Sequence, residues 1–207
     1  MASVLFVRHG ESQANVDNIL VSNQADPDLT GRGREQAEWL ASGWRAEPII
    51  AIYSSPLRRT IGTASAFLDD HPNLKISTDP RLHEIGLGRW DGLRIPDIER
   101  HEGERYRQWK EDPELGAPDG GEPLSAVAGR LGQYLEDMRE RHPEGLVVAA
   151  THADCLKALV LWTLHAPWTS AQWLHLQNVG GVYLQWRDDH WQMLAYPILA
   201  LPHSLVS

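Results

Sequence analysis

Short apolar runs alternate along the chain with longer segments in which apolar residues recur at helical spacing. A short run rich in β-branched residues is typical of a buried strand, whereas apolar residues at i, i+3, i+4 and i+7 indicate one face of a helix. The runs predict strands at residues 4–7, 49–54, 75–78, 146–151, 182–186 and 191–195. Strands that alternate with helices indicate the α/β class, here a three-layer α/β/α sandwich with a mostly parallel central sheet.

Helices are predicted between these strands. One apolar face runs through residues 37–44, another through 57–68 and a third through 124–138. Residues 156–164 are predicted to form a shorter, mostly apolar helix. Several strands are therefore followed by a helix, as expected for an α/β fold.

Residues 91–123 break this alternation. The segment is polar, and turn-forming pairs such as Asp112-Pro113 and Asp119-Gly120 interrupt it around one short predicted helix at 98–109. At about 33 residues it is too short to bury a core of its own. We interpret it as an insertion within a single domain of residues 1–207. An excursion of this kind is usually functional, so we expect it to cap the sheet as a lid or a pocket wall.

The size and charge of the chain narrow its class. Its 207 residues, 42% of them hydrophobic, suffice for one compact domain. The formal net charge of −9 disfavours nucleic acid and anionic membranes as partners, so an anionic substrate would need a local positive pocket. No apolar run reaches the roughly 18 residues that a membrane span needs.

Cys155 is the single cysteine of the chain. An intramolecular disulfide is therefore impossible and a cysteine-based metal site is not expected, which fits a reducing compartment. Residues 1–3 are not followed by the basic and apolar regions of a signal peptide. We predict a cytoplasmic protein, and a homodimer formed through a sheet edge or through the Trp-rich C-terminal half stays open.

The chemistry starts where the first predicted strand ends, at Arg8-His9-Gly10. Ligands of open α/β sheets bind at the carboxyl ends of the strands. Arginine offers a planar fork that suits phosphate, histidine a nitrogen that is active near neutral pH, and glycine a close approach of the backbone. This cluster predicts a phosphate group that is handled by a histidine.

Further candidate residues follow the other strands. Arg58 would lie near the N-terminus of the helix that Pro56 begins, where phosphate binds well. Glu84 comes just after the third strand, and His152 ends the fourth. Asn15, a few residues after His9, could donate a hydrogen bond to an anion, although capping a helix is its alternative role.

Taken together and in order, these segments resemble the histidine phosphatase superfamily, whose members are phosphoglycerate mutase-like. The resemblance covers roughly residues 3 to 186. One motif alone would be weak, whereas several in order at strand ends are strong. The matching residues are Arg8-His9-Gly10-Glu11, Asn15, Pro27-Asp28-Leu29-Thr30 with Gly33 and Gln36-Ala37, Ser55-Pro56-Leu57 with Arg59-Thr60, Leu82 and Glu84 with Gly88, Trp90 and Gly92, and Thr151-His152.

The resemblance implies covalent catalysis without a metal or another cofactor. His9 would become a phosphohistidine, while His152 and Arg8 would hold the phosphoryl oxygens. The second arginine would be Arg58 or Arg59, of which we favour Arg58. Glu84 would be the general acid and base.

Three assignments retain alternatives. Glu11 and Glu102 are rival acids to Glu84. Asn15 would add a hydrogen bond to the phosphate, if it is not simply a cap. Thr151-His152-Ala153-Asp154 stands where the family often has Ser-His-Gly-Gly, which places a carboxylate near the phosphate and could narrow the pocket.

The resemblance also bears on the type of reaction. Mutases of the superfamily typically carry two arginines after a tryptophan of the insertion, whereas this chain has Trp109-Lys110-Glu111. We expect Glu111 to repel a second acidic group of the substrate. The sequence thus predicts a phosphomonoester hydrolase that acts on a small phosphorylated metabolite. A phosphoglycerate mutase is the alternative, and an inactive binding module is disfavoured because the implied catalytic groups are all present.

Overall fold

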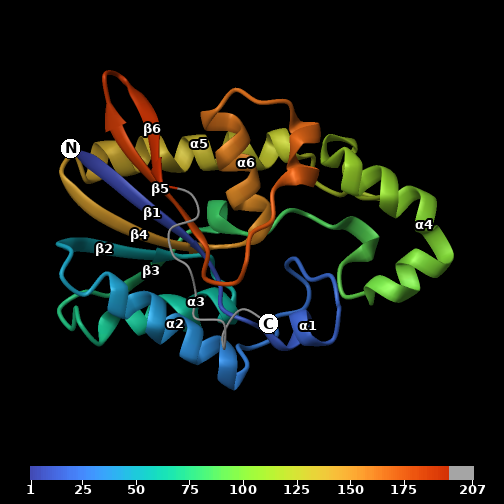
Figure 1. Cartoon of the computed structure of the whole chain (residues 1–207), viewed down its shortest axis with the longest axis horizontal. Helices are drawn as coiled ribbons and strands as arrows, with labels where there is room; N and C mark the ends of the chain where they lie inside the picture. Colours follow the sequence, from blue (N-terminus) through green and yellow to red (C-terminus); the bar gives the residue numbers. More distant parts are fainter. Residues whose placement is uncertain (196–207) are drawn as a thin grey trace.

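The structure is a computed structural model, and it describes residues 1–195. Its core is one six-stranded sheet with the strand order β3-β2-β4-β1-β5-β6 (Figure 1). Strands β1 to β4 are parallel to one another, whereas β5 pairs antiparallel with both β1 and β6, which confirms a mostly parallel sheet. The strands are β1 (Ala2–Arg8), β2 (Ile49–Ser54), β3 (Ile76–Thr78), β4 (Gly145–Thr151), β5 (Gly181–Arg187) and β6 (His190–Ala195).

Helices cover both faces of this sheet and make three layers. Helices α2 (Gly31–Gly43) and α3 (Arg58–Ser65) pack on one face, and α5 (Leu124–Arg141) and α6 (Ala153–Thr163) on the other (Figure 1). Side chains of β1 point alternately into the two core layers, and those of Leu5 and Val7 pack among residues of α2 and α3. This alternation explains why β1 is buried on both faces, as the central strand of a three-layer sandwich must be. Within residues 1–195, no helix is both long and apolar enough to cross a membrane.

The remaining helical elements are short, apart from one in the insertion. Helix α4 (Ile95–Glu111) contains the helix predicted at 98–109 and is kinked at Glu102, where φ is −141° and ψ is 30°. The short elements are α1 (Gln13–Val16), η1 (Ala66–Leu68), η2 (Pro80–Leu82), η3 (Gly88–Trp90), η4 (Pro113–Leu115) and η5 (Trp168–Trp173).

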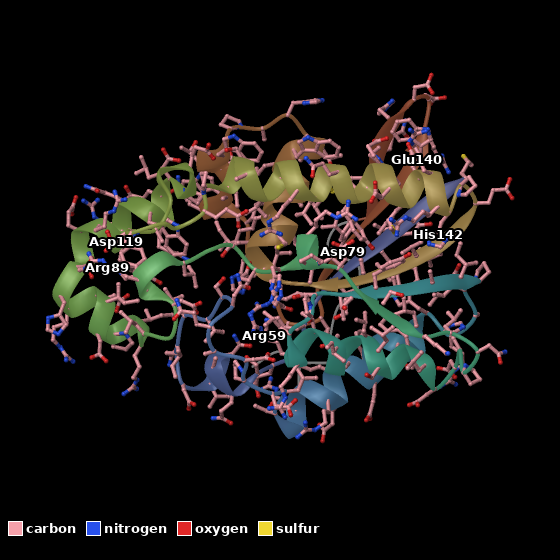
Figure 2. The ribbon with its side chains drawn as sticks, turned by 180° about the vertical axis from the view of Figure 1, so that it is seen from behind. Arg59, Asp79, Arg89, Asp119, Glu140 and His142 are labelled. Carbon is pink, nitrogen blue, oxygen red and sulfur yellow. The ribbon has the colours of Figure 1, made fainter. Side chains whose placement is uncertain are left out.

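The insertion is anchored to the domain by aromatic packing and by ion pairs. The buried Trp90 ring lies 5.8 Å from the ring of Trp109 on α4, measured between centroids. Arg89 pairs with Glu102 on α4 and with Asp119 at 3.0 Å beyond it, so it joins the two halves of the insertion (Figure 2). Whether this segment moves as a lid stays a prediction.

Strand register brings the candidate residues to one edge of the sheet. Arg8 is level with Thr151 in the β1–β4 pair, so His9 and His152 follow their strands side by side. The backbone N–H of His9 donates to the carbonyl of Thr151 at 3.1 Å. Because the carboxyl ends of parallel strands share an edge, residues far apart in the sequence meet there.

Candidate active site

Two buried histidines face each other at the carboxyl ends of β1 and β4. The ring centroids of His9 and His152 are 5.4 Å apart, and the rings are inclined by 66°. A third group, the guanidinium of Arg59 on α3, lies 3.3 Å from Nδ1 of His152. The structure thus gathers residues 9, 59 and 152 from three separate elements into one cluster.

His9 is held as a neutral ring with one nitrogen available. Burial, together with the charges of Arg8 and Arg59, holds its pKa well below the usual value. Its Nδ1 lies 2.7 Å from the carbonyl oxygen of Gly10, and a carbonyl can only accept, so Nδ1 carries the proton. The lone pair of the neutral ring is therefore on Nε2, the nitrogen that could attack phosphorus.

His152 is also neutral, but both of its nitrogens are engaged. Burial and then the Arg59 charge lower its pKa well below the usual value. Because the Arg59 guanidinium can only donate, Nδ1 of His152 accepts from it and Nε2 carries the proton. Nε2 then donates to the hydroxyl of Ser55 at 3.0 Å. The sequence predicted Ser55 only as part of the Ser55-Pro56-Leu57 motif, with no role of its own.

Arg59 supplies a buried positive charge to the cluster, and Arg8 supplies a second one that is partly buried. Arg59 is 1% exposed, and neither its Nε nor its Nη1 has a hydrogen-bond partner within residues 1–195. Its nearest carboxylate is that of Asp26, 3.9 Å from Nη1. Arg8 donates to the carbonyl of Leu176, and its buried Nε has no partner in the same range. Buried donors without partners are costly, so these guanidinium groups fit a site whose charge an anion completes.

The prediction of Arg58 is wrong, because the structure brings Arg59 into the cluster in its place. The Arg58 side chain is 65% exposed and pairs with Asp28 at 3.1 Å. The two arginines open α3, and consecutive helical residues point about 100° apart, so only one of them can face the sheet edge. Arg59 shares its buried face with Thr63, one turn later, and Figure 2 shows it lying inside the molecule.

Glu84 has the properties of an acid that can hold a proton near neutral pH. It follows η2 and is 9% exposed, and its Oε1 accepts from the N–H of Ile85 at 2.9 Å. Burial and the nearby Asp154 charge raise its pKa to about 7, against the opposing effect of Arg59. A carboxyl group tuned in this way can give and take a proton during one catalytic cycle.

The rival acids are engaged elsewhere. Glu102 accepts from Arg89 and from the indole N–H of Trp90, within the insertion. Glu11 accepts from the hydroxyl of Thr30 at 2.7 Å. Glu84, in contrast, feels the charges of both Arg8 and Arg59, so it stays the candidate for the acid.

The family model of the histidine phosphatase superfamily (branch 1) matches residues 4–198. The chain belongs to this superfamily. Phosphoserine phosphatase 1 of Hydrogenobacter thermophilus is 35% identical over 159 residues, which are 77% of this chain and 74% of that protein.

Two further relatives widen the picture. A 2,3-bisphosphoglycerate-dependent phosphoglycerate mutase of Thermoplasma acidophilum is 31% identical over 180 residues, 86% of this chain and 84% of the mutase. The structure of Bacillus stearothermophilus YhfR matches with a TM-score of 0.90 at 25% identity, covering 97% of this chain and 98% of that one. The resemblance inferred from the sequence is confirmed, and relatives named as phosphatases and as mutases both occur.

Asn15 caps α1 and is linked to the backbone of His9 through the side-chain amide of Asn178. Its Oδ1 accepts from the N–H of Ser12 at 3.0 Å, which is a capping contact. Asn178 donates both to the carbonyl of His9 at 3.0 Å and to Oδ1 of Asn15 at 3.3 Å. Direct phosphate binding by Asn15 stays a prediction, whereas Asn178 was not singled out by the sequence analysis.

Glycine is required at position 10 by a close approach of two backbone segments. A Cβ atom on Gly10 would lie 2.3 Å from the carbonyl oxygen of Gly33, far inside van der Waals contact. The N–H of Gly10 donates to the hydroxyl of Thr63 at 3.0 Å, one helical turn from Arg59. The glycine after His9 thus lets the start of α2 and the side of α3 pack against the loop that carries His9.

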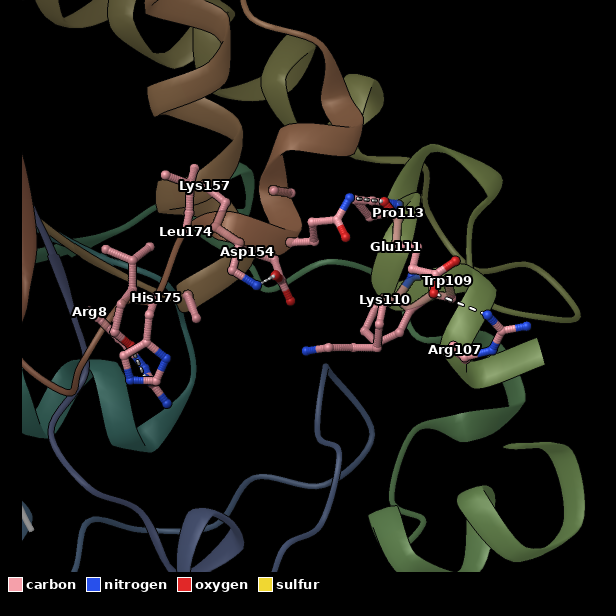
Figure 3. A pocket seen from close by; sticks show the side chains of 14 residues that line it. Arg8, Arg107, Trp109, Lys110, Glu111, Pro113, Asp154, Lys157, Leu174 and His175 are labelled. Carbon is pink, nitrogen blue, oxygen red and sulfur yellow. Dashed lines mark hydrogen bonds and ion pairs between the residues drawn. The ribbon is translucent and has the colours of Figure 1, made fainter. Parts of the chain in front are cut away.

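A cavity of about 490 Å³ opens beside Arg8, between the insertion and α6 (Figure 3). Asp154 lines it and pairs with Lys157 at 2.8 Å. Glu111 also lines it, and Arg107 pairs with its carboxylate at 3.2 Å. The expectation that Glu111 repels an acidic substrate group therefore has to be weakened, because this ion pair offsets its charge.

Proposed function

We propose that this protein is a metal-independent phosphomonoester hydrolase that acts through a phosphohistidine on a small phosphorylated metabolite. The observation that carries the proposal is the neutral His9 ring, with Nδ1 bound to the Gly10 carbonyl and Nε2 unprotonated, near the guanidinium groups of Arg8 and Arg59. A nucleophile and fixed positive charge are the two elements that phosphoryl transfer needs most.

In the first half of the reaction, Nε2 of His9 attacks phosphorus and the bond to the ester oxygen breaks. Arg8 and Arg59 offset the charge of the phosphoryl oxygens. Protonated Glu84 gives its proton to the leaving oxygen, so the alcohol departs neutral. The products of this half are the alcohol, a phosphohistidine and ionised Glu84.

In the second half, ionised Glu84 takes a proton from a water molecule as the water oxygen attacks phosphorus. The P–N bond breaks, inorganic phosphate forms, and His9 returns to its neutral state. Glu84 ends protonated, ready for the next substrate. Its pKa of about 7 suits both tasks, because acid and base forms are both populated near neutral pH.

Two observations favour hydrolysis over the mutase alternative. The relative with the higher identity of the two described is a phosphatase, at 35% against 31% for the mutase. The insertion also lacks the pair of arginines after Trp109 that the resemblance associates with mutases. We further propose a cytoplasmic location, since the single cysteine is a buried free thiol.

The experiment that tests the proposal incubates the purified protein, without added metal, with a panel of phosphomonoesters that includes 3-phosphoglycerate. Released phosphate and isomerised product are measured together. We expect phosphate without isomerisation, lost in His9→Ala and retained in His101→Ala, a control at an exposed position on α4. Rapid formation of 2-phosphoglycerate with little phosphate would favour a mutase, and a folded, active His9→Ala variant would exclude His9 as the nucleophile.

A further inference from the structure

The cavity beside Arg8 is positively charged, although the whole chain has a net charge of −9. Two carboxylates, those of Asp154 and Glu111, line it. Two of the three lysines of the chain are among its cations. The cations that line it are Arg8, Arg107, Lys110 and Lys157, so four positive charges face two negative ones. This imbalance suits an anionic ligand.

Ion pairs inside the cavity leave two of these cations, Arg8 and Lys110, without a carboxylate partner among residues 1–195. Lys157 pairs with Asp154 at 2.8 Å, and Arg107 pairs with Glu111 at 3.2 Å. Lys110 forms no ion pair with a carboxylate of residues 1–195, and its ammonium lies 5.9 Å from the centroid of the Trp109 ring. Figure 3 shows the Lys110 side chain extending from α4 into the open space below Asp154.

The charges of a bound substrate can be assigned on this basis, which rests on the proposed function. A phosphate dianion is matched by Arg8 and Arg59, and the Lys110 ammonium remains for one more negative group. We propose that the substrate is a small phosphate ester that also carries a carboxylate, and that Lys110 pairs with this carboxylate. The ammonium can follow the carboxylate of differently shaped esters, because lysine is a point charge on a flexible stem.

The test compares phosphate esters that differ in a carboxylate. The pairs are 3-phosphoglycerate with glycerol 3-phosphate, phosphoserine with phosphoethanolamine, and phosphoglycolate with ethyl phosphate. For each pair, kcat/KM of the acidic ester is divided by kcat/KM of its partner. We expect a ratio above one in the wild type for at least one pair, and a fall of about tenfold in Lys110→Met, as for a charged hydrogen bond. Lys75→Met, at an exposed position next to β3, should retain the wild-type ratio.

The outcomes separate this proposal from the proposed function. A ratio that stays the same in Lys110→Met overturns the carboxylate proposal alone. So does a wild type that hydrolyses the ester without the carboxylate better in every pair. Hydrolysis of p-nitrophenyl phosphate without activity on any of the acidic esters does the same. A wild type that hydrolyses none of these esters contradicts the proposed function instead.

A second, independent observation concerns the segment that carries Glu84. The guanidinium of Arg130 on α5 donates to two backbone carbonyl groups of this segment, that of Arg81 and, at 3.3 Å, that of Glu84. The same guanidinium is bound by both oxygens of Glu122, at 2.9 and 3.0 Å. Glu122 in turn accepts from the N–H of Gly86 at 3.2 Å, so the pair holds the segment on both sides of the acid.

The two carbonyl groups in between are bound as well. The hydroxyl of Thr151 donates to Leu82 and the thiol of Cys155 to His83, both at 2.8 Å. All four consecutive carbonyl groups from residue 81 to residue 84 therefore accept from side chains, in a segment that lies outside the sheet. Such contacts fix a backbone that has no ladder of its own.

We infer that Arg130 is a positioning residue for Glu84, again on the assumption of the proposed function. A misplaced Glu84 would protonate the leaving group less well. The defect should therefore be greatest for alkyl phosphates, whose leaving oxygen needs a proton, and small for p-nitrophenyl phosphate. A structural role alone would lower both rates equally.

The test measures kcat on ethyl phosphate and on p-nitrophenyl phosphate for Arg130→Met, Glu122→Gln, Glu84→Gln and the double variant Glu84→Gln/Arg130→Met. We expect Arg130→Met to lose roughly tenfold more on ethyl phosphate than on p-nitrophenyl phosphate, and the double variant to lose little beyond Glu84→Gln. Equal losses on both esters, or additive losses in the double variant, overturn the inference. If Arg130→Met fails to fold, Glu122→Gln decides by the same ratio, and Arg141→Met controls for loss of an exposed guanidinium from α5.

Discussion

Replacing Glu84 by glutamine should make the protein more stable at high pH while it disables the acid. The carboxyl group is 9% exposed, and its pKa is about 7 instead of the ordinary 4.5. The folded protein therefore binds this proton more tightly than the unfolded chain does. Stability from this group is complete below about pH 4.5 and is lost as the pH rises through about 7.

The magnitude follows from the two pKa values. Each tenfold change in a proton-binding constant is worth about 1.4 kcal/mol. The rise in pKa from 4.5 to about 7 therefore means that about 3 kcal/mol of the unfolding free energy present at low pH is lost at pH 8. Part of this loss reflects repulsion by Asp154. Glutamine removes the charge, so Glu84→Gln should gain a large part of this amount at pH 8 and little at pH 4.5.

Urea unfolding at pH 8 and at pH 4.5, for the wild type and Glu84→Gln, measures the effect. Glu102→Gln is the matched control, since that carboxylate forms an ion pair in the insertion and its removal should bring no gain. In parallel, Glu84→Gln should lose most activity on alkyl phosphates and keep more on p-nitrophenyl phosphate. A variant that is no more stable than the wild type at pH 8, or equally impaired on both esters, would refute the reasoning.

Three further predictions follow from the site. Arg59→Ala should lower kcat/KM by about 100-fold or more, because it removes the buried positive charge that offsets the phosphoryl oxygens. Arg58→Ala should change kcat/KM less than about twofold, as expected for a surface ion pair. Equal effects of the two substitutions would contradict the assignment of Arg59. Gly10→Ala should lower stability by about 2 kcal/mol through overpacking, while Gly31→Ala, with open space around its Cβ, should not; thermal unfolding compares them. Activity should survive treatment with EDTA. Activity that is lost in EDTA and restored by a divalent cation would disprove the metal-free mechanism.

The strands, and the positions of most candidate site residues at their ends, could be predicted because they depend on local sequence. The run at residues 4–7 is buried on both faces, so every position is apolar and the strand is visible without knowledge of its neighbours. His9 and His152 follow such runs directly. Their meeting could then be expected from the geometry of parallel strands alone.

The choice between Arg58 and Arg59 depended on a rotation that the sequence indicates only weakly. The helix begins at Arg58, and a start one residue earlier or later would exchange the inward and outward side chains. The buried pair of Arg59 and Thr63, four residues apart, was the signal available. A face containing arginine and threonine is polar, so a search for apolar periodicity passes over it.

The cavity could not be predicted for a different reason. Whether Glu111 repels a substrate depends on Arg107, four residues earlier on the same helix, and on how the insertion lies against α6. That Lys110 lines the same cavity as the Lys157–Asp154 pair, and has no carboxylate partner among residues 1–195, is likewise visible only in three dimensions. Charges read along a sequence do not reveal which of them neutralise one another.

The central claim is that phosphate passes through His9, and trapping the intermediate tests it most directly. The protein is mixed with p-nitrophenyl phosphate and quenched during turnover in alkali, in which phosphohistidine is stable, and the peptides are then analysed by mass spectrometry. The account predicts one phosphoryl group on the peptide that contains His9, at the nitrogen Nε2, and none in His9→Ala. Turnover with no phosphorylated peptide, or with the phosphoryl group on His152 or another residue, would contradict it.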